Sequence, residues 1–228
     1  MIAENVKNIR QRIINACRRV HRNPEEITLI AVSKTFGAGD IKKVVEAGLY
    51  DIGENYVQEL RQKRGEVPDE RVRWHFIGHL QSNKIKYIGD WIHMIHAVDS
   101  LSLGEQLSKW SGKTGRKIDV LVEVNTGDEE SKFGVSLVDT EKFVKDLSKL
   151  PNINLKGLMT IGPFLSNPED SRPAYRALAR LKKSLEDEGL KMPVLSMGMS
   201  HDFEVAIEEG ATMVRIGTAI FGSRVTRR

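Results

Sequence analysis

Lys34 is the residue whose type and position point most directly to chemistry. It comes two residues after the run 28–32, whose β-branched and apolar residues are typical of a buried strand. A lysine at the end of such a strand is partly removed from water, which lowers the proton affinity of its amine. A neutral amine can attack an aldehyde and form a Schiff base, so Lys34 is a candidate nucleophile. The alternative is an ordinary lysine whose charged end reaches solvent.

A second group of residues, near the end of the chain, has the composition of a phosphate site. Gly198 and Gly217 permit close approach to the backbone, and Ser196, Ser200 and Thr218 carry hydroxyl groups. Parallel barrels commonly bind phosphate after their last two strands, although plain tight turns use the same residue types. Together with the lysine, the group predicts a phosphorylated aldehyde held at both ends. Pyridoxal phosphate is the commonest such cofactor.

Arg215 and Asn55 also follow or end predicted strands, and each has two interpretations. Arg215 either balances the phosphate charge or faces the pyridine nitrogen of the cofactor, unless it simply pairs with a carboxylate such as Glu123. A full positive charge beside that nitrogen would disfavour its protonation and leave the cofactor a poor electron sink. Asn55 either lies against the cofactor or caps the helix that follows it.

Other ionisable residues point less clearly to a function. Glu54 and Glu123 lie at the ends of two different predicted strands and are either acid–base residues or partners of basic side chains. Lys132 falls in a loop expected over the site, and its role stays open. His93 and His96 are expected to be structural or exposed. Because the chain has no His-Glu-x-x-His pattern and a single cysteine, we expect no dedicated metal site.

These residues need a scaffold that brings the ends of several strands together. The predicted strands are residues 27–33, 50–53, 74–78, 94–98, 119–124, 155–161, 194–199 and 213–216. Short apolar strands that alternate with helical patterns favour an α/β fold, a single (β/α)8 TIM barrel with its site at the carboxyl ends of the strands. The alternative is an open doubly wound sheet, which the lack of Gly-x-Gly-x-x-Gly after the first strand disfavours.

The start of the chain carries the apolar stripe of an amphipathic helix, formed by Ile2, Val6, Ile9, Ile13 and Val20. Since the sequence ends soon after the eighth predicted strand, we expect this helix to cover the place of the eighth helix. Further helices are predicted at residues 41–47, 103–110, 141–150, 174–188 and 203–209. With no long linker, residues 1–228 are predicted to form one domain.

The composition limits the classes of protein to consider. A hydrophobic fraction of 40% and a charged fraction of 29% over 228 residues are those of a globular chain, which argues against disorder. The net charge of +4 is slight, and the basic clusters lack interleaved aromatics, so no specific nucleic-acid partner is expected. The sequence shows neither a signal peptide nor an apolar run long enough to span a bilayer, and Cys17 has no partner cysteine. We therefore expect a cytoplasmic protein without membrane contact.

Six motifs in order along the chain resemble those of a known family. They are AVSKT at 31–35, GENYVQE at 53–59, HFIGHLQSNK at 75–84, GLMTI at 157–161, SMGMS at 196–200 and VRIGT at 214–218. They resemble the pyridoxal phosphate homeostasis proteins, also called the YggS-like or proline synthetase co-transcribed family. In this chain His201 follows the fifth motif where the family usually has a small or acidic residue, and its role stays open.

The resemblance implies a barrel similar to the N-terminal domain of alanine racemase, with pyridoxal phosphate as an aldimine on Lys34. It implies further cofactor-binding residues, which are Asn55, Met159, Ser196, Ser200, Arg215, Gly217 and Thr218. It also implies that the protein carries or buffers the cofactor without substantial turnover and with no catalytic residue. Apo forms of pyridoxal phosphate enzymes are then expected partners, and we expect a monomer.

Two enzymatic alternatives stay open. An amino-acid racemase of the alanine racemase type needs a second base, which alanine racemase takes from a tyrosine of a C-terminal domain that this sequence lacks. A Schiff-base aldolase acting on a sugar phosphate needs an acid–base partner beside its lysine, and Glu54 could serve. The family resemblance favours the carrier over both.

Overall fold

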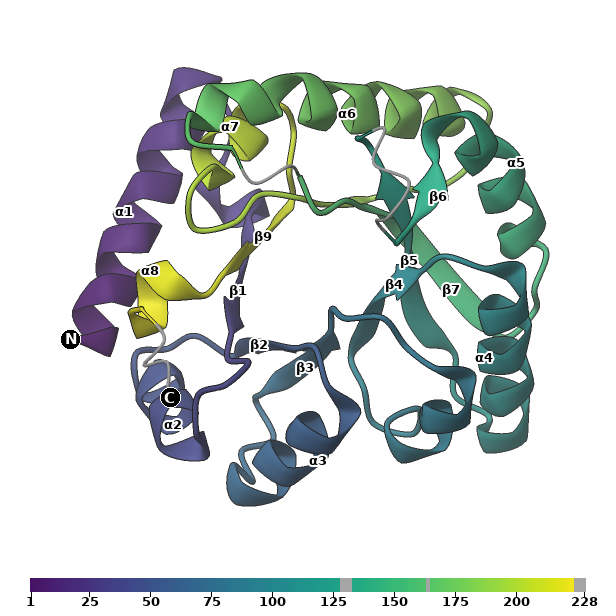
Figure 1. Cartoon of the computed structure of the whole chain (residues 1–228), viewed down its shortest axis with the longest axis horizontal. Coiled ribbons are helices and arrows are strands. Elements are labelled where there is room, and N and C mark those ends of the chain that lie inside the picture. Colours follow the sequence, from purple (N-terminus) through teal and green to yellow (C-terminus); the bar gives the residue numbers. More distant parts are fainter. Residues whose placement is uncertain (128–132, 163–164, 224–228) are drawn as a thin grey trace.

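The computed structural model describes residues 1–127, 133–162 and 165–223, and its centre is a closed barrel of parallel strands (Figure 1). The barrel strands are β1 (Thr28–Val32), β2 (Asp51–Glu54), β3 (Arg73–Phe76), β4 (Met94–Val98), β5 (Ile118–Asn125), β7 (Ile153–Met159), β8 (Val194–Ser196) and β9 (Met213–Ile216). They pair in the order β4-β3-β2-β1-β9-β8-β7-β5, and a further β4–β5 pairing closes the barrel. Among the described strands, the short β6 (Val135–Ser136) pairs only with the end of β5. The predicted TIM barrel is confirmed.

Helices form the outer ring in Figure 1. They are α1 (Ile2–Arg19), α2 (Ala38–Glu46), α3 (Val57–Glu66), α4 (Leu101–Thr114), α5 (Leu137–Ser148), α6 (Arg172–Asp187), α7 (Phe203–Glu208) and α8 (Thr218–Phe221), with 3-10 turns η1 (Pro24–Glu26), η2 (Ser82–Tyr87) and η3 (Pro168–Ser171). Within the described ranges, no helix is both long enough and apolar enough to cross a membrane.

Helix α1 covers the gap in the ring, as predicted. After β9 the described chain forms only the four-residue α8, a single turn that is too short to cover the barrel wall. The buried stripe of α1 faces inward, and Arg12 forms a two-pronged pair with Glu204 of α7 at 2.8 Å for both contacts. Asn5 donates to the carbonyl of Ile220 in α8 at 2.8 Å. These contacts join the first helix to the last two.

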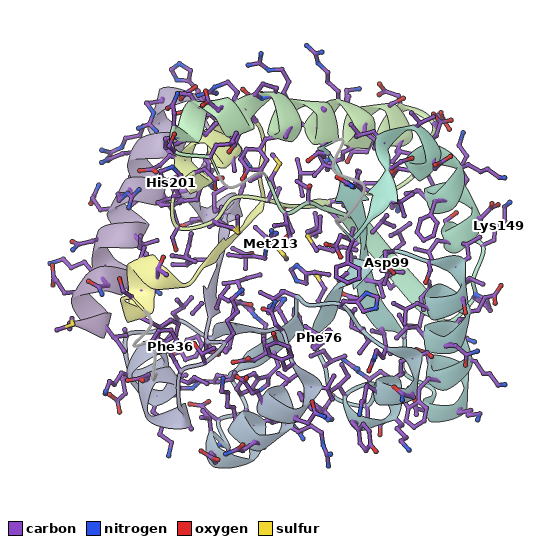
Figure 2. The ribbon with its side chains drawn as sticks, in the orientation of Figure 1. Phe36, Phe76, Asp99, Lys149, His201 and Met213 are labelled. Atoms are coloured by element: carbon purple, nitrogen blue, oxygen red, sulfur yellow. The ribbon has the colours of Figure 1, made fainter. Side chains whose placement is uncertain are left out.

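Two hydrophobic clusters follow from the alternation of side chains along each strand. The larger lies between the sheet and the helices. The smaller fills the inside of the barrel and consists of Ile30, Met94, Ala97, Leu121, Met159 and Met213. Figure 2 shows Met213 inside the barrel and Lys149 pointing outward from the helical ring. A filled interior makes the carboxyl ends of the strands the floor of any cavity, as the fold class predicts.

The strand boundaries agree with the prediction at β4 and β9 and differ elsewhere by a few residues. The strand predicted at 194–199 ends at Ser196, because Gly198 has a φ of 91° and turns the chain. A Cβ at position 198 would lie 2.6 Å from the Cβ of Ala206, so this turn packs directly on α7. The strand predicted at 155–161 begins and ends earlier, as Ile153–Met159. Both shifts assign residues beyond the strands to the loops that line the site.

Candidate functional site

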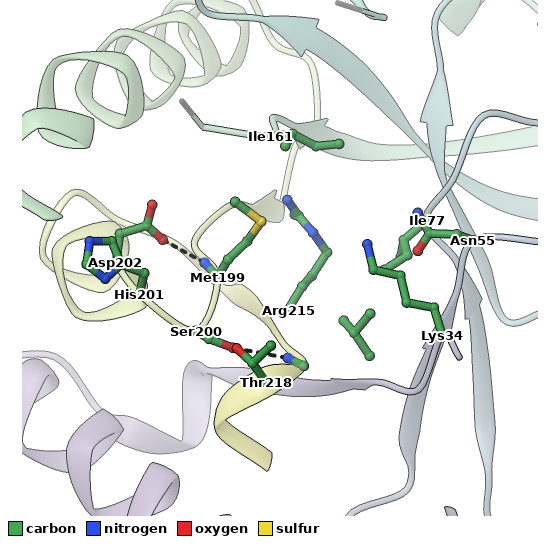
Figure 3. Close-up of a pocket in the computed structure, with 12 residues that line it drawn as sticks. Lys34, Asn55, Ile77, Ile161, Met199, Ser200, His201, Asp202, Arg215 and Thr218 are labelled. Carbon is green, nitrogen blue, oxygen red and sulfur yellow. Dashed lines mark hydrogen bonds between the residues drawn. The ribbon is translucent and has the colours of Figure 1, made fainter. Parts of the chain in front are cut away.

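A cavity of about 280 Å³ opens at the carboxyl ends of the strands. The described residues that line it are Val32, Lys34, Asn55, Ile77, Ile161, Met199, Ser200, His201, Asp202, Arg215, Gly217 and Thr218. Six of the predicted site residues are therefore brought together from four strand ends far apart in sequence. In Figure 3, Lys34 and Asn55 lie on one side, Ser200 and Thr218 lie on the other, and Arg215 lies between them.

Lys34 is placed by the turn that follows β1. Alternation from Ile30 and Val32 directs its side chain to the inside of the barrel, into the mouth of the cavity. The next residue, Thr35, has a φ of 72°, which is unfavourable for a β-branched side chain. Its amide donates to Glu59 at 3.2 Å, which helps to hold this strained turn. The strain indicates that the direction of the lysine is imposed by its surroundings.

A buried ion pair supports the same turn from behind. Lys63 of α3 donates to Glu54 at 2.7 Å and to the carbonyl of Ser33 at 2.9 Å. Burial raises the pKa of the Glu54 carboxyl, and the hydrogen bonds from Lys63 and Ser33 oppose that rise. Glu54 thus faces the helix layer and not the cavity, so it is not placed to act as an acid or base at Lys34. Sequence reasoning did not identify Lys63.

Asn55 presents an unsatisfied polar atom at the cavity. Its Oδ1 is buried and has no hydrogen-bond partner among the described residues. The backbone of Asn55 is held by the backbone of Gly78. The two pack so closely that a Cβ at position 78 would lie 2.4 Å from the carbonyl oxygen of Asn55. Since a buried acceptor without a donor costs free energy, this atom indicates a missing donor, such as a ligand.

The opposite wall consists of the loop after β8 and the start of α8. The hydroxyl of Ser200 accepts hydrogen bonds from the amides of Gly217 and Ala219, both at 3.2 Å. Asp202 fixes the loop, because its Oδ1 accepts from the amide of Met199 at 2.7 Å. The predicted hydroxyl and glycine group therefore exists as one wall, made of Ser200, Gly217 and Thr218.

Arg215 is almost fully buried at the floor between these walls. Its Nη1 donates to the hydroxyl of Ser196 at 2.6 Å and its Nη2 donates to the carbonyl of Thr160 at 2.8 Å. In Figure 3 its guanidinium points toward Ile161 and away from Ser200. Burial lowers the pKa of Arg215, but an arginine stays protonated at neutral pH. The charge is therefore directed across the floor and not at the hydroxyl wall.

Ser196 and Met159 lie behind the cavity, not on its lining. Both side chains are fully buried. Ser196 Oγ is engaged by Arg215 and by His96 Nδ1, the latter at 3.1 Å, and Met159 belongs to the cluster inside the barrel. His201 does line the cavity, whereas Lys132 lies outside the described residues.

Glu123 is a second acidic group near this floor, at the end of β5. Burial raises its pKa to about 7, Asp99 adds to the rise, and Arg215 opposes it. It therefore changes charge close to neutral pH. Elsewhere, the described part of the chain has no cluster of three or more His, Cys, Asp or Glu side chains arranged to hold a metal ion.

These features fit pyridoxal phosphate. A lysine amine faces a wall of hydroxyl groups across one cavity, a buried amide oxygen lies on the side of the lysine, and a guanidinium lies between the two sides. The cofactor carries its aldehyde and its phosphate-bearing methylene on neighbouring ring carbons, and the cavity offers a lysine amine for the first and hydroxyl donors for the phosphate.

Comparisons with known proteins agree with this fit. Residues 2–225 match the family model of the alanine racemase N-terminal domain. The chain is 45% identical over 222 residues to the pyridoxal phosphate homeostasis protein of Aquifex aeolicus, covering 97% of each chain. It is 42% identical over 224 residues to the protein of that name from Pseudomonas aeruginosa, covering 98% of this chain and 96% of the other.

Solved structures show the same relationship. PipY of Synechococcus elongatus, solved with pyridoxal phosphate bound, has a TM-score of 0.87 and 32% identity, over 97% of this chain and 100% of PipY. Alanine racemase from Corynebacterium glutamicum has a TM-score of 0.71 at 19% identity, over 100% of this chain and 62% of the racemase, which shows a shared fold alone. The chain therefore belongs to the alanine racemase N-terminal domain family and, within it, to the family of the pyridoxal phosphate homeostasis proteins.

Proposed function

We propose that this protein binds pyridoxal phosphate reversibly at Lys34 and carries or buffers the cofactor without substantial turnover. The observation that carries the proposal is the placement of Lys34 and the Ser200 wall on opposite sides of one cavity. The names of the relatives and the cofactor in PipY support it.

Each wall has a separate task. When bound, pyridoxal phosphate supplies an aldehyde that a neutral lysine amine captures with loss of one water, and water reverses the capture. Lys34 is the amine, and the strained turn at Thr35 keeps it directed at the cavity. The hydroxyls of Ser200 and Thr218 supply donors for the phosphate, and Gly217 allows it to approach the backbone closely. The Asn55 side chain lies on the same side of the cavity as Lys34, where its unsatisfied Oδ1 would accept a hydrogen bond from the cofactor.

Arg215 keeps the site from acting as an efficient electron sink. Its guanidinium is held at the floor by Ser196 and Thr160, on the side away from the hydroxyl wall. A permanent positive charge beside the ring disfavours protonation of the ring nitrogen. Without that protonation, carbanion chemistry at a bound amino acid is poorly stabilised, which favours storage of the cofactor over turnover.

The groups that the sequence offered to the enzymatic alternatives, a tyrosine base and Glu54, do not line the cavity, although His201 and Asp202 do. Racemisation needs a second base, yet Tyr175 is fully buried and donates to Asp202 at 2.7 Å, and burial raises its pKa further. Tyr56 is 59% exposed at the start of α3 and does not line the cavity. An aldolase would use Glu54, which instead contacts Lys63.

The experiment is a comparison of binding and turnover in the same preparation. Wild-type protein should bind pyridoxal phosphate at one site per chain, and Lys34→Ala should lose the covalent fraction. Racemase, transaminase and sugar-phosphate aldolase assays should give no turnover above that of free cofactor. Substantial turnover that disappears in Lys34→Ala would contradict the carrier proposal.

Transfer to an enzyme and the monomeric state are further parts of the proposal. The loaded protein should restore activity to an apo pyridoxal phosphate enzyme faster than simple dissociation of the cofactor allows. Sedimentation should give the mass of a single chain, 25.7 kDa. If the apo enzyme is activated no faster than the cofactor dissociates from this protein, the protein would be a buffer of the cofactor and not a carrier.

A further inference from the structure

A line of buried hydrogen bonds runs through the barrel from Arg215 to its opposite end. Arg215 Nη1 donates to Ser196 Oγ at 2.6 Å, and that oxygen lies 3.1 Å from His96 Nδ1. His96 Nε2 lies 3.0 Å from His75 Nδ1, and His75 Nε2 lies 3.0 Å from Asp51 Oδ1. Ser196, His96 and His75 are each 0% exposed, so no solvent contact competes with this chain of contacts.

If each imidazole carries one hydrogen, the carboxylate of Asp51, which only accepts, fixes the direction of every hydrogen bond. Arginine only donates, so Ser196 Oγ accepts from Arg215 and keeps a hydrogen that it can donate to His96 Nδ1. His96 then carries its hydrogen on Nε2 and donates to His75 Nδ1. His75 in turn donates from Nε2 to Asp51. In this arrangement each ring nitrogen of His96 and His75 has one partner.

The charge states of the flanking groups agree with that direction. Burial lowers the pKa of His96 well below its usual value, and the neighbouring His75 and Arg215 lower it further. Burial of Asp51 is outweighed by hydrogen bonds from His75 and Arg73, which lower its pKa to about 2. A neutral imidazole thus lies next to the serine, and an ionised carboxylate accepts at the far end.

We propose that His96 is a positioning residue for the cofactor, which acts by orienting the Ser196 hydroxyl and through it the guanidinium of Arg215. His75 and Asp51 hold His96 in the tautomer that leaves Nδ1 free to accept. This inference rests on the proposed function, because only there does Arg215 act on a bound cofactor. Without the serine contact, the Arg215 charge has a competing partner in Glu123, whose pKa it already affects.

Two variants of His96 separate positioning from simple packing. The amide of His96→Asn reaches the place of Nδ1 and still accepts from Ser196, but it loses the contact with His75. The amide of His96→Gln reaches the place of Nε2, which keeps the contact with His75 and loses the one with Ser196. Both remove one hydrogen bond, and Asn, which is one methylene smaller than Gln, leaves the larger void, so a merely structural role predicts the greater effect for His96→Asn.

The measurements are cofactor affinity and imidazole nitrogen NMR. His96→Gln and Ser196→Ala should weaken pyridoxal phosphate binding about tenfold, the loss expected for one hydrogen bond to a charged group. His96→Asn should stay within about threefold of wild type, because the contact with Ser196 persists. In the cofactor-free wild type, the nitrogen shifts of His96 and His75 should show Nδ1 without hydrogen and Nε2 with hydrogen.

Several results would overturn the inference. Equal losses in folded His96→Asn and His96→Gln, or hydrogen on Nδ1 of His96 in the wild type, would contradict it while the proposed function stands. The NMR result needs no variant to fold, so misfolding of a substitution does not prevent the test. Failure of the wild type to bind pyridoxal phosphate would instead contradict the proposed function and this inference with it.

Discussion

Nζ of Lys63 lies 2.7 Å from Oε1 of Glu54, inside the layer between β2 and α3. The side chains are 8% and 0% exposed, so both charges are removed from water. The same ammonium donates to the carbonyl of Ser33, the residue before Lys34. The ion pair therefore links the stability of the barrel wall to the position of the nucleophile.

Removal of the lysine alone should be costly. Lys63→Met leaves Glu54 buried without its cation, and the free energy of unfolding should fall by about 3 kcal/mol in urea denaturation. The double variant Glu54→Leu with Lys63→Met should recover most of that loss, since it buries no unpaired charge. As a control, Lys43→Met removes an exposed pair with Asp40 and should change stability by less than about 0.5 kcal/mol. Equal effects of Lys63→Met and Lys43→Met would contradict the assigned role of the pair.

The pKa of Glu123 predicts a dependence of stability on pH. Because burial raises this pKa from 4.5 to about 7, the folded state binds more protons than the unfolded state between these values. The contribution of Glu123 to the free energy of unfolding therefore falls as pH rises through this window. Glu123→Gln should be more stable than wild type by about 2 kcal/mol at pH of about 8, and the difference should vanish below about pH 4.

The control for that experiment is a carboxyl whose pKa is lowered by its surroundings and not raised. A hydrogen bond from Lys145 lowers the pKa of the exposed Glu141. Glu141→Gln should thus lose a little stability above its pKa, where Glu123→Gln gains. Denaturation profiles of Glu123→Gln that run parallel to wild type at every pH would show that Glu123 is not held protonated.

Asn55 should be more important for binding than for stability. Its Oδ1 is buried without a partner, so Asn55→Ala should leave the free energy of unfolding within about 1 kcal/mol of wild type. The same variant should weaken pyridoxal phosphate binding by about tenfold, because a contact beside the ring is lost. The control is Asn154→Ala, whose side chain donates to Asp119 at 2.7 Å away from the cavity. A loss of stability in Asn55→Ala without a loss of affinity would assign the residue to packing.

The fold could be predicted from the sequence because its signals are local. Apolar runs that end in polar residues identified the barrel strands, and the stripe of α1 identified the helix that completes the ring. Lys34, Asn55, Ser200, Arg215, Gly217 and Thr218 were predictable because each follows or ends a strand, and strand ends meet on one face of a parallel barrel.

Contacts between strands or layers could not be predicted in this way. Helix α3 buries Val57, Leu60 and Lys63, and a lysine at a buried position breaks the apolar pattern that predicts a helix face. Ser196 belongs to the same short motif as Ser200, yet it lies within β8 and faces the barrel interior. His75 and His96 meet across two strands at 3.0 Å, although no sequence spacing joins them.

The most direct test of the central claim is the visible absorption spectrum of the purified protein with pyridoxal phosphate, before and after borohydride, followed by peptide mass spectrometry. The proposal predicts a yellow band in wild type that borohydride abolishes, with a pyridoxyl group recovered on Lys34, and no such band in Lys34→Ala. A protein that stays colourless with added cofactor, or a pyridoxyl group on other lysines only, would contradict it.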